Sequence, residues 1–146
     1  MSTSTDMGAW GTGPFDNDDA LDLFLEIEDA GPAEAAQRLR AALQVVAAED
    51  DSYLEAPAAN EAVAAAAVVA FSYSHSDPTG NPRVARWLTE RAPALGPDDG
   101  ALAAKALERV CGEHSEWLEL WSEAGLGQQA RAVAEQLALA LQSPRP

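Results

Sequence analysis

Apolar side chains recur along most of the chain at intervals of three and four residues, the spacing that places them on one face of an α-helix. Leu21, Phe24 and Leu25 show it first, directly after a polar cluster, and predict a helix over residues 18–29. The same spacing predicts helices over 32–49, 60–73, 83–91 and 98–111, and a last helix after Gly127. Residues 50–60 and 74–82 are predicted to be connections, because turn-forming residues gather there.

The segment predicted as a helix over 60–73 is apolar on all sides, with valines scattered among alanines. Such a helix is usually buried at the centre of a domain. The pattern therefore predicts an all-α fold: a single compact domain of five to seven short helices around a buried Ala-rich central helix. We expect this domain to span 7–142, with 1–6 as a disordered extension and 143–146 as a frayed tail. The sequence leaves open whether a helix breaks over 112–115 and whether Met1 or Met7 is the physiological start.

Composition supports the helical interpretation. Among the 146 residues are 32 alanines and 16 leucines, but valine and isoleucine together number nine. Alanine and leucine are among the best helix formers, whereas strands are enriched in β-branched residues. The length also fits one domain, since domains cluster at roughly 100–150 residues.

Charge and cysteine content narrow the function classes. With 24 acidic and 9 basic residues the formal charge is −15, which argues against direct binding to a nucleic-acid backbone. Cys111 is the only cysteine, so an intrachain disulfide is excluded. The longest apolar run, 62–71, is half the length of about 20 residues that a bilayer span needs. We therefore expect a cytoplasmic protein with no membrane contact and no secretory signal.

The least random segment of the chain is MGAWGTGPFDNDDA, Met7 to Ala20. It resembles the start of the bacterial domain-of-unknown-function family 4259, whose members open with a similar Trp-Gly and Asp-Asn-Asp-Asp-Ala signature. Weaker similarity continues at 53–57 and at 115–121, so the resemblance covers residues 7 to about 141. It implies a small stand-alone bacterial domain and implies no activity.

Physical reasoning about this segment gives three interpretations. In the first, its glycines allow a tight turn, Asp16 caps the first helix, and Phe15 packs as a hydrophobic staple. In the second, Asp16, Asp18 and Asp19 hold a divalent cation, although the segment does not match a calcium-loop pattern. In the third, Trp10 forms the centre of a recognition patch. A dinucleotide-binding loop is excluded, because the glycine spacing does not match and no strand precedes it.

Two further groups contain residue types that occur in catalytic or metal-binding sites. Ser72, His75 and Asp77 are the residues of a hydrolase triad, but triads converge from separate parts of a fold, and a polar loop is the preferred interpretation. Cys111 and His114 are spaced like a pair of zinc ligands, but zinc needs three or four ligands. Cys111 also continues the apolar face of its helix, which predicts a buried thiol.

Two rows of carboxylates follow helical spacing. We call Asp18, Asp22 and Glu26 the first acidic row, and Glu113, Glu116, Glu119 and Glu123 the second acidic row. Like charges at these spacings repel by about 0.2–0.5 kcal/mol per pair. Solvent and counterions offset this repulsion on an ordinary exposed face, and a basic partner would offset it on a binding face.

These observations predict a non-enzymatic protein-binding or regulatory module that acts on a basic protein, of an inhibitor, immunity-like or nucleic-acid-mimic type. Its binding residues are expected to be Trp10, Phe15 and the two acidic rows, with no catalytic residue and no cofactor. The alternative is a small divalent-metal-dependent enzyme or metal-binding protein that uses Asp16, Asp18 and Asp19. A third possibility is a structural subunit whose apolar helix packs against a second copy. The oligomeric state is left open.

Overall fold

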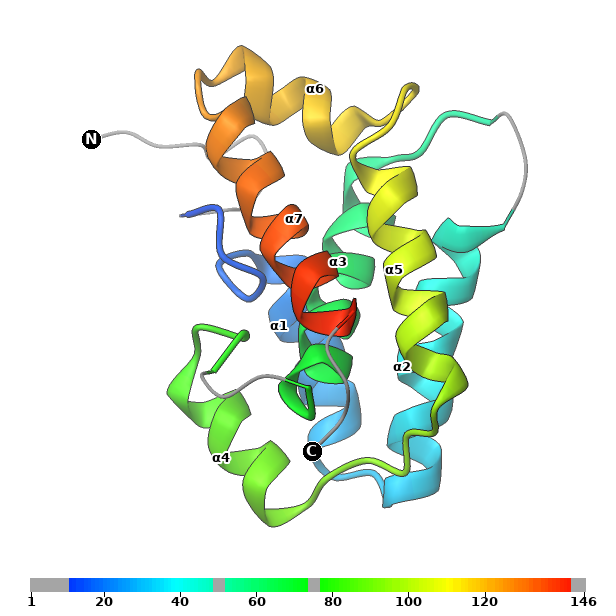
Figure 1. The fold of residues 1–146 in the computed structure, drawn as a ribbon. Coiled ribbons are helices and arrows are strands. Elements are labelled where there is room, and N and C mark those ends of the chain that lie inside the picture. Colours follow the sequence, from blue (N-terminus) through cyan, green and yellow to red (C-terminus); the bar gives the residue numbers. More distant parts are fainter. Residues whose placement is uncertain (1–10, 49–51, 74–76, 143–146) are drawn as a thin grey trace.

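The computed structural model describes residues 11–48, 52–73 and 77–142, and these form seven α-helices with no β-strand among them (Figure 1). In chain order the helices are α1 (Asp18–Glu28), α2 (Pro32–Ala47), α3 (Ala56–Phe71), α4 (Pro82–Glu90), α5 (Asp98–Val110), α6 (Glu116–Glu123) and α7 (Gly127–Gln142). The predicted all-α single domain is confirmed. The expected extension 1–6 and tail 143–146 lie outside the described residues. No described helix combines the length and the apolar character needed to cross a membrane.

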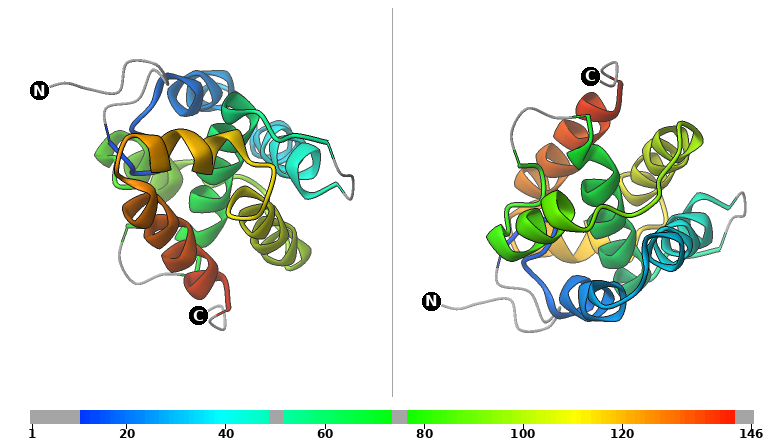
Figure 2. Two further views of the ribbon diagram at one scale, coloured as in Figure 1. Left: turned by 90° about the horizontal axis from the view of Figure 1, so that it is seen from above. Right: turned by 90° about the horizontal axis from the view of Figure 1, so that it is seen from below.

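Helix α3 lies at the centre, and each of the other six described helices contacts it (Figure 2). Residues 62–70 are all at most 3% exposed, so this part of α3 has no face left for a second copy of the chain. Its central residues are mostly alanines, whose small side chains let the neighbouring helices approach closely. The buried, alanine-rich central helix is therefore as the sequence predicts.

The start of α3 differs from the prediction, because the helix begins at Ala56 and not at residue 60. Glu116 Oε1 accepts a hydrogen bond from the Ala56 N–H at 2.8 Å, and Pro57 has no N–H to satisfy in this first turn. The capping carboxylate comes from α6, 60 residues away, which helical periodicity does not reveal. Just before this helix, Leu54 is buried and Tyr53 is 49% exposed.

Helix α1 also has a different cap from the predicted one. Asn17, not Asp16, is the N-cap, and its Oδ1 accepts a hydrogen bond from the Ala20 N–H at 2.8 Å. Phe15 consequently lies one position too early for a hydrophobic staple. Its ring instead packs edge-on against Phe24, with 6.4 Å between the ring centroids, and is 2% exposed.

The helix is broken over 112–115, which decides the question left open by the sequence. Ser115 caps α6 by accepting the Leu118 N–H at 3.3 Å. His114 adopts a left-handed backbone (φ 61°), and its carbonyl accepts the Leu54 N–H at 2.7 Å. The Glu116 N–H then donates to the Leu54 carbonyl at 2.8 Å. This short parallel bridge fixes the start of α6 beside the start of α3.

A bidentate ion pair joins α2 to the start of α5. Arg40 Nε and Nη2 donate to the two carboxylate oxygens of Asp99 at 2.7 and 3.0 Å, and Asp99 also accepts the Gly96 N–H at 2.7 Å. These bonds hold the pKa of Asp99 below its usual value. The N-cap of α5 is Pro97, and the buried Asp99 connects two helices.

Replacing this carboxylate should test the connection. We expect Asp99→Asn to lower the free energy of unfolding at pH 7 by about 1.5–3 kcal/mol, the range for hydrogen bonds to charged groups. The contribution of Asp99 is present above its unfolded pKa of about 3.9 and is lost as the pH falls through the lower folded pKa. The difference between wild type and variant should therefore shrink below about pH 4. Urea unfolding at a series of pH values measures it.

Asp98→Asn is the matched control, since Asp98 is exposed and precedes Asp99 directly. It should change stability by less than about 0.5 kcal/mol. Equal losses in the two variants would contradict the role assigned to Asp99.

Candidate functional site

The segment that carries the family signature is built mainly as a turn. Trp10 lies outside the described residues, so its predicted role in a recognition patch stays a prediction. Phe15 belongs to the hydrophobic core and presents almost no surface to a partner. Asp16 Oδ2 accepts the Gly13 N–H at 3.1 Å. A Cβ atom on Gly11 or Gly13 would lie 2.7 or 2.6 Å from that same oxygen, so a side chain at either position would displace the Asp16 carboxylate.

The three carboxylates predicted to hold a metal ion have different structural roles. Asp16 closes the turn with Gly13, and Asp19 Oδ2 accepts a hydrogen bond from Asn60 Nδ2 on α3 at 3.0 Å. Asp18 is exposed in the first turn of α1, where the helix dipole favours a negative charge. Within the described residues no group of three metal-ligating side chains occurs. The predicted cation site is therefore not found in this part of the chain.

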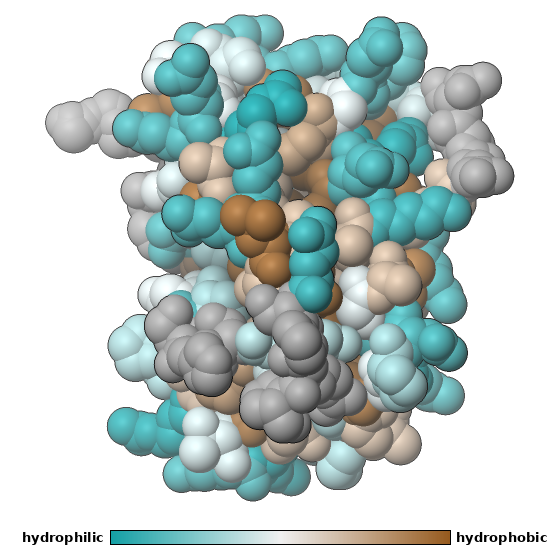
Figure 3. Space-filling model, in the orientation of Figure 1, coloured by the Kyte–Doolittle hydropathy of each residue, from teal (hydrophilic) through white to brown (hydrophobic). Residues whose placement is uncertain are grey.

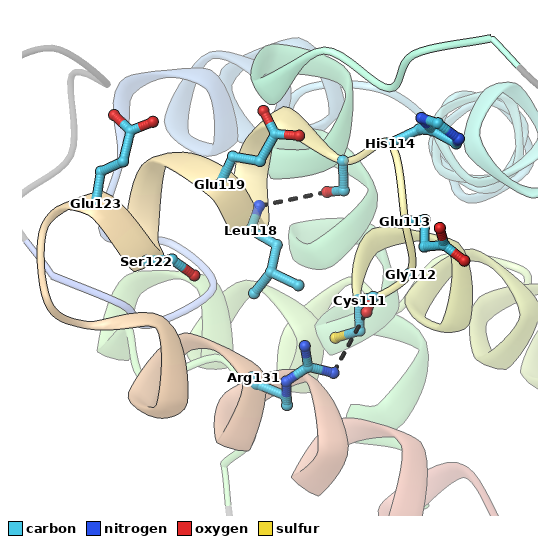
Figure 4. A pocket seen from close by; sticks show the side chains of 10 residues that line it. Cys111, Gly112, Glu113, His114, Leu118, Glu119, Ser122, Glu123 and Arg131 are labelled. Atoms are coloured by element: carbon cyan, nitrogen blue, oxygen red, sulfur yellow. Dashed lines mark hydrogen bonds between the residues drawn. The ribbon is translucent and has the colours of Figure 1, made fainter.

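Neither of the other two groups assembles a site. Ser72 Oγ donates to the Val69 carbonyl and Asp77 accepts from Thr79, while His75 lies outside the described residues. Cys111 is the C-cap that follows α5, so His114 is not one helical turn along the same face, and Figure 4 shows the His114 ring directed away from Cys111. Burial raises the pKa of the Cys111 thiol, which makes it a poor nucleophile at neutral pH.

The first acidic row lies on the exposed face of α1. Asp18 and Asp22 are exposed, and Glu26 forms an ion pair with Arg38 of α2 at 3.4 Å. Glu61, on the neighbouring turn of α3, adds another carboxyl group to this face. Its pKa is raised, first by burial and then by the negative charges of Glu26, Asp19 and Asp22.

Two residues of the second acidic row accept hydrogen bonds within the fold, and two do not. Glu116 caps α3, and Glu119 accepts a hydrogen bond from the Tyr53 hydroxyl at 2.6 Å. Glu113 and Glu123 are exposed and make no hydrogen bond or ion pair with another described residue. Among the described residues, these two carboxylates therefore have no partner that neutralises them.

Glu113, Glu119 and Glu123 border an open groove of about 600 Å³ between the α5–α6 connection, α6 and the start of α7 (Figure 4). We call it the acidic groove, and its lining residues are Cys111, Gly112, Glu113, His114, Ser115, Leu118, Glu119, Ser122, Glu123 and Arg131. Figure 4 shows Glu119 and Glu123 side by side on α6, both directed away from Arg131. Arg131 donates to the Cys111 carbonyl at 3.3 Å and forms no ion pair with the described glutamates.

Comparison with known proteins identifies the family of the chain. The model of the family described as "Domain of unknown function (DUF4259)" matches residues 8–133. The chain belongs to the DUF4259 family. No curated protein and no solved structure matches it. The matched range includes both acidic rows and every residue that lines the acidic groove, so this DUF4259 domain carries its candidate site inside the family region.

Sequence reasoning found the charges of this DUF4259 domain but missed the groove that they border. The carboxylate spacing over 113–123 predicts an acidic face, yet nothing in it shows that Glu116 caps α3 or that Arg131 approaches from α7. The helix break after Cys111 was the one signal in the sequence that could have indicated the groove, because a change of direction between two helices can leave a hollow.

Neutralising Glu61 tests the repulsion on the first acidic face. Because the folded pKa of Glu61 is raised, its ionised form destabilises the fold at neutral pH, and the penalty disappears as the pH falls below the unfolded value of about 4.3. We expect Glu61→Gln to raise the free energy of unfolding at pH 7 by about 0.5 kcal/mol, with no gain at pH 4. Urea unfolding measures it, with Glu90→Gln as control. A loss of stability would contradict this account.

The hydrogen bond to Glu119 should show in the titration of Tyr53. This bond, with burial and the charges of Glu119, Glu116 and Glu123, raises the pKa of Tyr53 to about 12. We expect NMR titration of the Tyr53 ring to give this value, and Glu119→Gln to lower it toward about 10. Glu113→Gln should leave the pKa unchanged. A Tyr53 pKa near 10 in the wild type would mean that the bond does not form.

Proposed function

We propose that this DUF4259 domain is a non-enzymatic protein-binding module that acts on a basic partner, as an inhibitor, an immunity-like protein or an acidic mimic of nucleic acid does. The observation that carries this proposal is the pair of exposed carboxylates, Glu113 and Glu123, at a groove where no described cation pairs with them. A partner's lysine or arginine would supply the missing positive charge.

The small share of carboxylates in ion pairs supports an external partner. Within the described residues the ion pairs involve four carboxylates, those of Glu26, Glu28, Glu34 and Asp99. The chain as a whole carries a formal charge of −15, so most of its acidic groups are not neutralised in this way. A surface of one sign raises the association rate with an oppositely charged protein, and salt weakens the effect.

The cluster of described arginines at α4 does not form a competing anion-binding surface. Arg83, Arg86 and Arg91 line a hollow at α4, but Glu28, Asp29 and Glu90 line the same hollow and balance their charge. Arg83 is bound to both carboxylate oxygens of Glu28, at 2.7 and 2.9 Å. A partner with clustered cations therefore fits this surface better than a nucleic acid does.

Quantitative affinity purification from the native cell tests the proposal. We expect the tagged wild-type domain to retain a basic protein at low salt and to release it at about 0.5 M salt, because screening weakens exposed charge pairs. The variant Glu113→Gln, Glu119→Gln, Glu123→Gln tests the second acidic row, and Asp18→Asn, Asp22→Asn, Glu26→Gln tests the first. At least one of them should reduce the retained amount.

The control removes three exposed carboxylates from outside the rows, Glu90→Gln, Glu108→Gln, Glu135→Gln, with the same change in net charge. It should retain the partner like the wild type. If the wild type enriches no protein above background, or if the control loses as much partner as both row variants, the proposal is wrong.

A further inference from the structure

This inference rests on the proposed function. We infer that the basic partner docks in the acidic groove through an extended segment in which an arginine stands beside an aliphatic residue. The first acidic row, on the face of α1, then contributes long-range attraction and not the contact surface. This inference depends on shape, lining chemistry and the placement of charge within the groove.

The shape suits a short segment of chain. The groove holds about 600 Å³, which lies within the roughly 300–1,000 Å³ common for ligand sites, and it is open along one side. Its walls are held in place before any partner binds, because the Leu54–His114 and Glu116–Leu54 hydrogen bonds fix the connection between α5 and α6. A preformed groove loses little conformational freedom on binding.

The groove is lined by apolar, acidic and basic side chains, and this combination selects the occupant. Leu118 and Cys111 are half-buried and present apolar surface to it, so an aliphatic side chain would remove that surface from water. Arg131 stands on the α7 side and Glu119 and Glu123 on the α6 side (Figure 4). A second cation beside Arg131 would be repelled. The arginine of the partner must therefore approach α6, with the aliphatic residue over Leu118.

The position of Glu123 gives the strongest argument for a cation from outside. Glu123 is the last residue of α6, where the helix dipole disfavours a negative charge. Glu28 ends α1 in the same way, and there Arg83 binds both of its carboxylate oxygens. Glu123 has no such partner among the described residues, and Glu119 one turn earlier adds repulsion. A guanidinium can bind carboxylates in a bidentate manner, which favours arginine over lysine.

The probe for this inference is a blocked peptide, Gly-Ser-Arg-Leu-Arg-Ser-Gly, titrated into the ¹⁵N-labelled full chain. We expect amide shift changes at Leu118, Glu119, Ser122 and Glu123, with a dissociation constant in the millimolar range. Glu119→Gln combined with Glu123→Gln should weaken binding about tenfold, the effect of losing two exposed charge pairs. Glu90→Gln combined with Asp98→Asn, which removes the same charge from exposed positions outside both rows, should change it less than about twofold.

Two altered peptides separate the parts of the argument. Replacing both arginines by citrulline keeps the shape but removes the charge and should abolish the shifts. Replacing leucine by serine should weaken binding severalfold. The inference is overturned if the shifts fall on α1, if the citrulline peptide binds equally well, or if no shift appears at millimolar peptide. None of these results decides the proposed function, because the capture experiment with the two row variants tests that independently.

Discussion

The close packing of α3 is the constraint from which the rest of this fold follows. Residues 62–70 are at most 3% exposed, and a helix so fully enclosed must be covered from every side by the other helices of a small domain. Alanine makes this possible, because the helices that contact α3 meet few large side chains. Enclosing α3 also buries its N-terminus, where the free backbone N–H groups need hydrogen-bond acceptors. Glu116 of α6 provides the acceptor for the Ala56 N–H.

That cap connects the core to the candidate site. Because Glu116 is held at Ala56 and the backbone of Leu54 bonds on both sides of Ser115, α6 has a fixed position relative to α3. Glu119, one turn further, then meets Tyr53, and α6 packs against α7. The acidic groove is the space that this arrangement leaves, so burial of α3 and the geometry of the groove depend on the same few hydrogen bonds.

This dependence explains what the sequence predicted and what it did not. An apolar surface on all sides of a helix is a local signal, and it correctly placed α3 at the centre. The polar cluster before α1 correctly marked a helix start, although the capping atom belongs to Asn17 because Asp16 turns back to Gly13. The Arg40–Asp99 pair and the groove need contacts between residues 59 positions apart or on three separate elements, and no periodicity in the chain encodes such contacts.

The acidic charge can now be divided by physical cause. Asp18 and Glu116 lie in first turns, where the helix dipole favours them, and Glu28 is neutralised by Arg83. Asp22, in the middle of α1, and Glu123, at the unfavourable end of α6, have neither advantage. Repulsion among such residues lowers stability unless a cation reduces it. Since α6 borders a groove with an apolar lining, a partner that docks there can gain both charge neutralisation and apolar burial.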